Sequence, residues 1–225
     1  MPDIFKLTLI VLASLIPGIL WIRFFHIKDR FEREPVRMLL RAFIMGALAV
    51  GLAAVVETPF TSWVLPDAPV LSQLFAAFVV IGLGEEFFKA LAVYLAAFRS
   101  SEFDEEMDGI IYGITVGIGF SVVENILYSL AFGLSVAPVR ALIASLAHAC
   151  FSGIFGVYCG RAKFSDKPST ELAKGLAYAA VSHGLYDYLL ISRIGSPLAA
   201  IALVVVLYFV LQYYLRRALA QSPFR

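Results

Sequence analysis

Seven ionisable side chains lie well inside otherwise apolar stretches of this 225-residue sequence, and they are the residues best suited to do chemistry. They are Glu85, Glu86, Lys89, Glu124, His148, His183 and Asp187. A charge at the middle of a bilayer costs at least about 2.5–3.5 kcal/mol, so each needs a partner or a function. Glu85, Glu124, His148 and His183 fall within roughly 5 Å of the midpoints of four successive stretches. Their common depth predicts that they converge.

The spacing of these residues pairs several of them on one helical face. Lys89 follows Glu85 by four residues and Glu86 by three, so it can face either carboxylate, and we expect the other carboxylate to stay free. His183 and Asp187 are four residues apart, which lets Asp187 reach the imidazole. Taken alone, the Glu-Glu-Lys set could equally be a buried ion pair that fixes helix register.

Two imidazoles with one carboxylate suit a catalytic Zn²⁺ site that leaves one position for water. The candidate metal ligands are His148, His183 and Glu124, with Asp187 as the alternative to Glu124. Glu85 or Glu86 would then be the general base that deprotonates the water, while Lys89 keeps its neighbour ionised.

A metal-free reaction also fits these residues. A desolvated glutamate would activate the water directly, and His148 or His183 would stabilise the oxyanion together with the amide of Asn125. Both schemes amount to amide hydrolysis at membrane depth.

The composition supports a membrane protein and excludes several other classes. The chain is 60% apolar and only 16% charged, with a mean hydropathy of +0.85, whereas an ordinary soluble domain is about a quarter charged. A net charge of +1 without a dense basic face offers nucleic acid nothing to hold. Cys150 and Cys159 are the only cysteines, which excludes a disulfide scaffold and indicates packing roles.

Seven apolar stretches are long enough to cross a bilayer, which requires about 20 residues per helix. They run approximately over residues 5–25, 38–57, 69–98, 109–133, 138–160, 172–192 and 196–215. We therefore expect an all-α, polytopic transmembrane helical bundle of about seven spans, forming a single membrane domain over residues 1–225.

The basic residues predict the orientation of this bundle. Fourteen of the 18 Lys and Arg residues fall on one side, whereas Lys6, Arg140 and Arg193 fall on the other. Positively charged loops stay in the cytosol, so we expect the N-terminus outside and the C-terminus in the cytosol. The charged segments 23–37 and 99–108 are expected to be solvated connectors, and the segment 57–69 an outer interfacial loop.

The order of the polar motifs resembles that of the PrsW intramembrane protease family. The motifs are Glu85-Glu86-x-x-Lys89, then Phe120-x-x-x-Glu124-Asn125, then His148, then His183-x-x-x-Asp187. The resemblance covers about residues 20–190. It implies a multi-pass endopeptidase of the bacterial cytoplasmic membrane that makes the first, extracytoplasmic-side cut in a single-pass anti-sigma factor. That family is similar to type II CAAX prenyl endopeptidases and bacteriocin-immunity membrane proteins, which carry His where Glu124 stands here.

The favoured hypothesis is thus an intramembrane endopeptidase whose site opens toward the outer half of the membrane. Its candidate catalytic residues are Glu85, Glu86, Lys89, Glu124, Asn125, His148, His183 and Asp187. The expected partners are a single-pass membrane protein substrate and the lipid bilayer. The alternatives are a proton-coupled transporter that uses the buried Glu and His residues, and a CAAX-type prenyl-protein endopeptidase or immunity protein.

Overall fold

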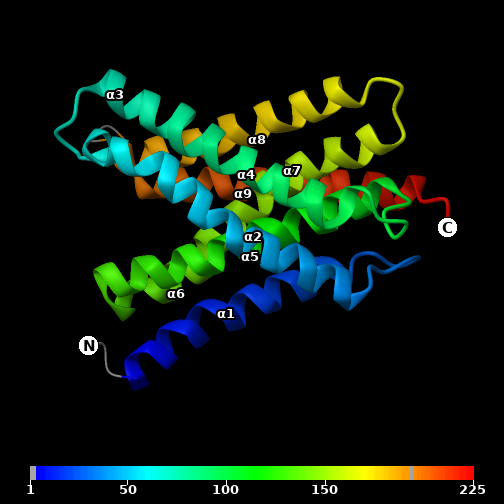
Figure 1. Cartoon of the computed structure of the whole chain (residues 1–225), viewed down its shortest axis with the longest axis horizontal. Coiled ribbons are helices and arrows are strands. Elements are labelled where there is room, and N and C mark those ends of the chain that lie inside the picture. The colour runs from blue at the N-terminus through cyan, green and yellow to red at the C-terminus, as the bar shows by residue number, and fades with distance from the viewer. Residues whose placement is uncertain (1–3, 193–194) are drawn as a thin grey trace.

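The computed structural model describes residues 4–192 and 195–225, and within these ranges the chain is helical apart from short connections (Figure 1). The all-α prediction is confirmed. Five long helices are uninterrupted: α1 (Ile4–His26), α2 (Val36–Glu57), α5 (Glu106–Phe132), α8 (Pro168–Ile191) and α9 (Pro197–Gln221). Arg193, which the orientation argument assigned to the outer side, lies outside the described residues.

Two further helices are each built from several segments joined end to end. One consists of α3 (Val70–Phe75), the π-helical segment η2 (Ala76–Leu83), α4 (Gly84–Val93) and the π-helical segment η3 (Tyr94–Phe98). The other consists of η4 (Leu134–Val136), α6 (Ala137–Val139), the π-helical segment η5 (Arg140–Ala144) and α7 (Ser145–Lys163). In addition, the 3₁₀ segment η1 (Thr58–Val64) extends α2. Wide π-helical turns are often found next to functional residues, and here they precede Glu85 and His148.

Five helices of the described chain are long and apolar enough to cross a membrane. They cover Ile4–His26, Val36–Val64, Glu106–Phe132, Leu134–Lys163 and Pro197–Gln221. The helices over 70–98 and 168–191 contain five of the seven predicted ionisable residues, and the other two, Glu124 and His148, lie in α5 and α7. Large apolar side chains on the outer helices are exposed, including Leu20, Val55 and Phe209. Such surfaces need an apolar solvent, so the molecule is a multi-pass membrane protein; seven spans with the N-terminus outside remain a prediction.

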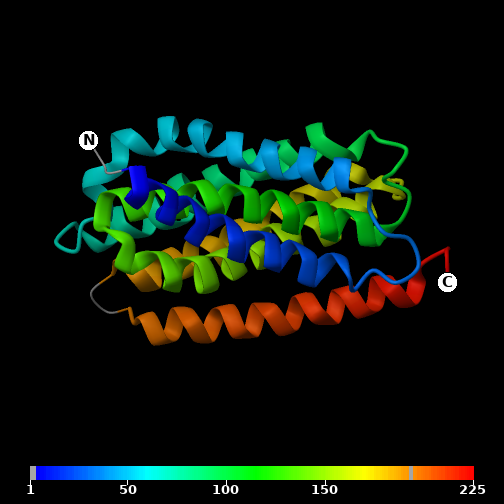
Figure 2. The same cartoon turned by 90° about the horizontal axis from the view of Figure 1, so that it is seen from below.

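Helices α5 and α7 form the centre of the bundle, and small residues let them approach closely. A Cβ atom added at Gly117 of α5 would lie 2.5 Å from the carbonyl oxygen of His148 on α7. Glycine here permits a backbone contact that any other side chain would obstruct. α9 lies along one edge of the bundle, and the two chain ends lie at opposite ends of it (Figure 2). Cys150 and Cys159 are free and buried in α7, as their packing roles predict.

The prediction that segments 23–37 and 99–108 are solvated is wrong for four of their acids. Asp29, Glu34, Glu105 and Asp108 are all buried. Glu105 and Asp108 form a capping box at the start of α5, and the connection between α1 and α2 folds over this turn. Glu34 accepts a hydrogen bond from the hydroxyl of Tyr112 on α5. The two acidic segments therefore pack together instead of facing water.

Candidate active site

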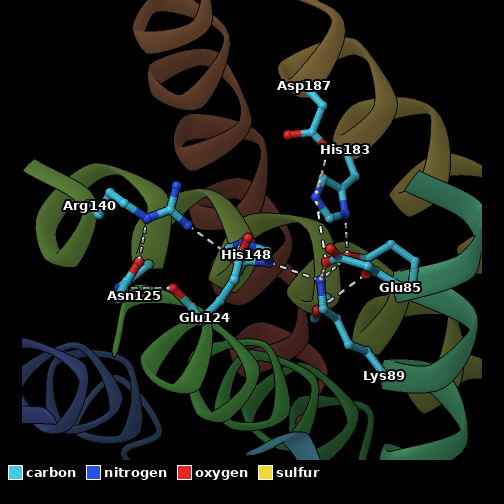
Figure 3. A network of polar contacts seen from close by, with 12 residues as sticks. Glu85, Lys89, Glu124, Asn125, Arg140, His148, His183 and Asp187 are labelled. Carbon is cyan, nitrogen blue, oxygen red and sulfur yellow. Dashed lines mark hydrogen bonds and ion pairs between the residues drawn. The ribbon is translucent and has the colours of Figure 1, made fainter. Parts of the chain in front are cut away.

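Lys89 lies at the centre of a buried polar cluster contributed by α4, α5, α7 and α8 (Figure 3). Its Nζ atom donates to Glu85 Oε2 at 2.8 Å, to Glu86 Oε1 at 2.9 Å and to His148 Nδ1 at 2.9 Å. The expectation that one of the two carboxylates stays free is therefore wrong. Positions three and four residues apart both lie over the same face of α4, so one ammonium group reaches both.

The contact with Lys89 determines which nitrogen of His148 carries the proton. An ammonium group can only donate, so Nδ1 accepts and the proton of the neutral ring is on Nε2. Nε2 lies 2.9 Å from Glu124 Oε2, within ion-pair distance. The same carboxylate oxygen lies 3.2 Å from Nη2 of Arg140. His148 thus links the Lys89 cluster on α4 to Glu124 on α5 (Figure 3).

Both nitrogens of His183 face carboxylates. Nδ1 lies 3.0 Å from Glu86 Oε1, and Nε2 lies 3.2 Å from Asp187 Oδ2. The structure therefore brings together the i, i+4 pair that the spacing indicated (Figure 3). Glu85 Oε2 is 3.7 Å from Nε2. The ring of Phe151 stacks on the imidazole with centroids 4.7 Å apart, which limits its rotation.

Asn125 is already fully engaged in hydrogen bonds. Its Nδ2 donates to Ser145 Oγ at 3.0 Å and to Ser121 Oγ at 3.3 Å, and its Oδ1 accepts from Arg140 Nε at 3.1 Å. One residue after Glu124 is about 100° further round the helix, so Asn125 points toward α7. In this arrangement it is not free to donate to an oxyanion, which corrects the role suggested from sequence.

A cavity of about 460 Å³ lies against the cluster. The polar side chains that line it are Glu57, Glu85, Glu124, Tyr128, Arg140, His148, His183, Tyr186 and Asp187. Glu85 faces this space, whereas Glu86 and Lys89 lie behind it and are buried. The two adjacent glutamates therefore differ in access to a bound molecule, a distinction that their sequence positions do not make.

Two charged residues of the cavity wall, Glu57 and Arg140, were not among the predicted site residues. Glu57 ends α2, and its buried Oε1 has no hydrogen-bond partner in the described chain. Arg140 contacts Glu124 and Asn125, and its Cζ lies 3.7 Å from the centroid of the Tyr128 ring. Both lie near the ends of their apolar stretches, where a charged residue is ordinarily interpreted as an interfacial one, so neither was predicted to belong to the site. In the sequence, both residues fall on the predicted outer side of Glu124, and this shared position is the signal that could have assigned them to the same site.

Three residues of the cluster form a group that could hold a metal ion. Glu85, His148 and His183 each offer a ligand atom, and these atoms lie within 4.8 Å of one another. Two imidazoles and a carboxylate are a donor set of catalytic zinc sites, so the residue types present fit a metal. Each ring nitrogen already faces another side chain, so a bound metal would take the place of one such contact on His148 and of one on His183. The predicted set had Glu124 in place of Glu85, whereas in the structure Glu124 lies 2.9 Å from His148 Nε2 as its ion-pair partner.

Acids and imidazoles from four helices meet beside a cavity, inside a bundle whose outer surface is apolar. This fold and site define a membrane-embedded protein with the donor set of a hydrolytic metal centre. Comparison with known proteins specifies the class further. The model of the PrsW family intramembrane metalloprotease matches residues 34–214. The chain therefore belongs to the PrsW family of intramembrane metalloproteases, as the order of its motifs suggested, and it is a peptidase.

Curated relatives agree with this assignment over most of the chain. The protease PrsW of Geobacillus kaustophilus is 38% identical over 186 residues, covering 82% of this chain and 80% of the relative. The protease PrsW of Bacillus subtilis is 36% identical over 184 residues, covering 80% and 82%. That of Oceanobacillus iheyensis is 31% identical over 210 residues, covering 93% and 95%. No solved structure matches the chain significantly.

Proposed function

We propose that this protein is an endopeptidase that hydrolyses a peptide bond of a single-pass membrane protein in the bacterial cytoplasmic membrane. The observation that carries the proposal is the convergence of Glu85, His148 and His183, from three helices, on one cavity. Membership of a metalloprotease family supports the same chemistry. A buried cluster that served only to hold helices together would not need a cavity beside it.

The metal in this proposal is Zn²⁺, held by Glu85, His148 and His183. Bound zinc would polarise the scissile carbonyl and lower the pKa of a water molecule. The chain's own residues hold the donors in place. Glu86 fixes His183 through Nδ1, and Lys89 donates to both adjacent carboxylates. The choice of zinc over other metals rests on the donor set of two imidazoles and one carboxylate.

Glu124 is the proposed proton acceptor for the attacking water. Its side chain is 18% exposed and lines the cavity. Arg140 and His148 hold its Oε2, while Oε1 makes no hydrogen bond or ion pair with the described residues. This assignment exchanges the roles inferred from sequence, because Glu85 joins the metal-binding group and Glu124 takes over as general base.

The position of the cavity supports a cut on the outer side of the membrane. Its wall includes Val64, Pro66, Leu190 and Ile191, which lie in or beside segments at the N-terminal end of the bundle (Figure 1). The charge asymmetry predicts that this end faces outward. An extracytoplasmic-side cut in a single-pass anti-sigma factor, which the family resemblance implies, agrees with this placement.

Reconstituted protein tests the proposal with a tagged single-pass substrate and metal analysis on the same samples. Wild type should cleave the substrate and hold about one zinc per chain. Glu85→Gln should lose both cleavage and zinc, whereas Glu124→Gln should lose cleavage and keep zinc, because Glu124 is outside the donor group. Glu171→Gln, at an exposed pair on α8, serves as the control and should retain both.

Two results would contradict this function. Full cleavage by Glu85→Gln, or by Glu124→Gln, would remove the assigned role of that residue. Proton flux into the same liposomes that depends on Glu85 and Glu124, without cleavage of any substrate, would support a transporter instead.

A further inference from the structure

A second group of carboxylates lies at the opposite end of the molecule from the cavity. Asp29, Glu105 and Asp108 each offer an oxygen, and these oxygens lie within 4.8 Å of one another. Asp29 comes from the connection between α1 and α2, whereas Glu105 and Asp108 belong to the first turn of α5. These segments lie at the end of the bundle that carries the C-terminus (Figure 2).

No basic side chain of the described residues forms an ion pair with these three acids. Two basic side chains in this connection contact backbone instead, since Arg33 Nε donates to the carbonyl oxygen of Asp29 at 3.0 Å. His26 Nε2 similarly lies 2.9 Å from the carbonyl oxygen of Glu34. Buried carboxylates without positive partners are strongly unfavourable, so some other positive species must compensate them.

Asp29 shows this lack of compensation most clearly. It is fully buried, and neither of its carboxylate oxygens has a hydrogen-bond partner in the described part of the chain. One oxygen of Asp108 is hydrogen-bonded and the other is not. Oδ2 accepts from the backbone N–H groups of Asp104 and Glu105, at 2.7 and 2.8 Å. The buried Oδ1 has no hydrogen-bond partner among the described residues. Two oxygens of Asp29 and one of Asp108 are thus available to a ligand.

We propose that Asp29, Glu105 and Asp108 bind a hard divalent cation, with Ca²⁺ the best fit by size. All three donors are carboxylate oxygens, which Ca²⁺ and Mg²⁺ prefer and zinc does not require. Donor oxygens that lie within 4.8 Å of one another can all reach one cation at the Ca²⁺–oxygen distance of roughly 2.4 Å. Bound there, the cation ties the α1–α2 connection to the first turn of α5.

Terbium luminescence tests this site on the full-length protein in detergent, because Tb³⁺ replaces Ca²⁺ and is sensitised by nearby aromatic rings. Tyr112, which contacts Glu34, is the expected sensitiser. Emission should saturate with Tb³⁺ and be displaced by Ca²⁺, and Ca²⁺ should raise the melting temperature. Asp29→Asn and Asp108→Asn should each lower the affinity at least about tenfold.

Two further variants separate this site from its surroundings. Glu102→Gln removes a nearby acid that is paired with Arg37 and lies outside the group, so its affinity should match wild type. Glu85→Gln should also leave terbium binding intact, because Glu85 belongs to the cavity at the other end. The proposal is overturned if wild type shows no saturable binding, or if Asp29→Asn binds as wild type does. An Asp29→Asn protein that is more stable while Ca²⁺ has no effect on wild type would mean that protons compensate the cluster.

Discussion

The hydroxyl of Ser152 on α7 lies 3.2 Å from Oε2 of Glu86 on α4, and it completes the contacts of that carboxylate. The other oxygen, Oε1, already accepts from Lys89 and faces His183. Glu86 therefore has no oxygen left for a substrate or a water molecule. Its neighbour Glu85 faces the cavity. One glutamate of the adjacent pair positions the site, and the other is available for chemistry.

Replacing Lys89 with Met should strongly destabilise the protein as well as abolish cleavage. The change leaves two buried carboxylates without their shared cation, and breaking a buried pair in this way costs about 3–5 kcal/mol. Thermal unfolding in detergent measures the effect. Adding Glu86→Gln to Lys89→Met should restore part of the lost stability, since one uncompensated charge is then removed.

Lys174→Met is the matched control for Lys89→Met. Lys174 pairs with Glu171 on the same kind of helical spacing, but its side chain is 51% exposed. Exposed pairs contribute only about 0–1 kcal/mol, so this variant should unfold within a few degrees of wild type. Equal melting temperatures for Lys89→Met and wild type would contradict the central position of Lys89.

Asp187→Asn should weaken zinc binding and cleavage about 10- to 100-fold, because the Asp187 carboxylate lies 3.2 Å from His183 Nε2 and its negative charge favours a cation there. The chain should fold normally, since Asp187 is partly exposed at the cavity. Zinc affinity and cleavage by the same sample provide the two readouts. Asp67→Asn in the loop after α2 is the control and should leave both unchanged. A variant with normal zinc affinity and normal cleavage would show that Asp187 does not support the metal site.

Arg140→Gln should reduce cleavage about tenfold or more, since a hydrogen bond to a charged group contributes about 1.5–3 kcal/mol. Arg140 holds both Glu124 and Asn125, so its loss frees the proposed proton acceptor to rotate. Zinc content should stay at the wild-type level. Arg140→Lys should recover only part of the rate, because lysine keeps the charge but lacks the planar fork. Full activity of Arg140→Gln would show that Glu124 needs no such anchor.

Gly117→Ala should lower both stability and cleavage, with a stability cost of about 1–3 kcal/mol. The added methyl group would press on the backbone of α7 at His148. Gly51→Ala on α2 is the control, because a Cβ at Gly51 meets no atom within 4 Å. Melting temperatures and rates for the two variants check the expectation. If Gly117→Ala matched Gly51→Ala, the α5–α7 approach would not position His148.

Much of the helical framework was predictable, because about 20 consecutive apolar residues have few stable solutions other than a membrane helix. The pairing of His183 with Asp187 was predictable for the same kind of local reason, since four residues make one turn. Convergence of Glu85, His148 and His183 followed from their common depth. Each of these inferences uses only the position of a residue along its helix axis, which the sequence gives directly.

What sequence could not supply is rotation about those axes and the folding of the loops. Whether Glu85 or Glu86 faces the cavity depends on how α4 is turned against α7 and α8, and the π-helical segment before it changes that angle. Asn125 turned toward α7 for the same reason. The burial of Asp29 required knowledge that two loops, far apart in the chain, fold onto one another.

X-ray absorption spectroscopy of the zinc-loaded protein tests the central claim most directly. The account predicts two imidazole nitrogens and at least one carboxylate oxygen at about 2.0–2.1 Å from zinc, with one imidazole lost in His183→Ala and the carboxylate lost in Glu85→Gln. A protein that binds no zinc while it cleaves its substrate, or a spectrum unchanged by both substitutions, would contradict it.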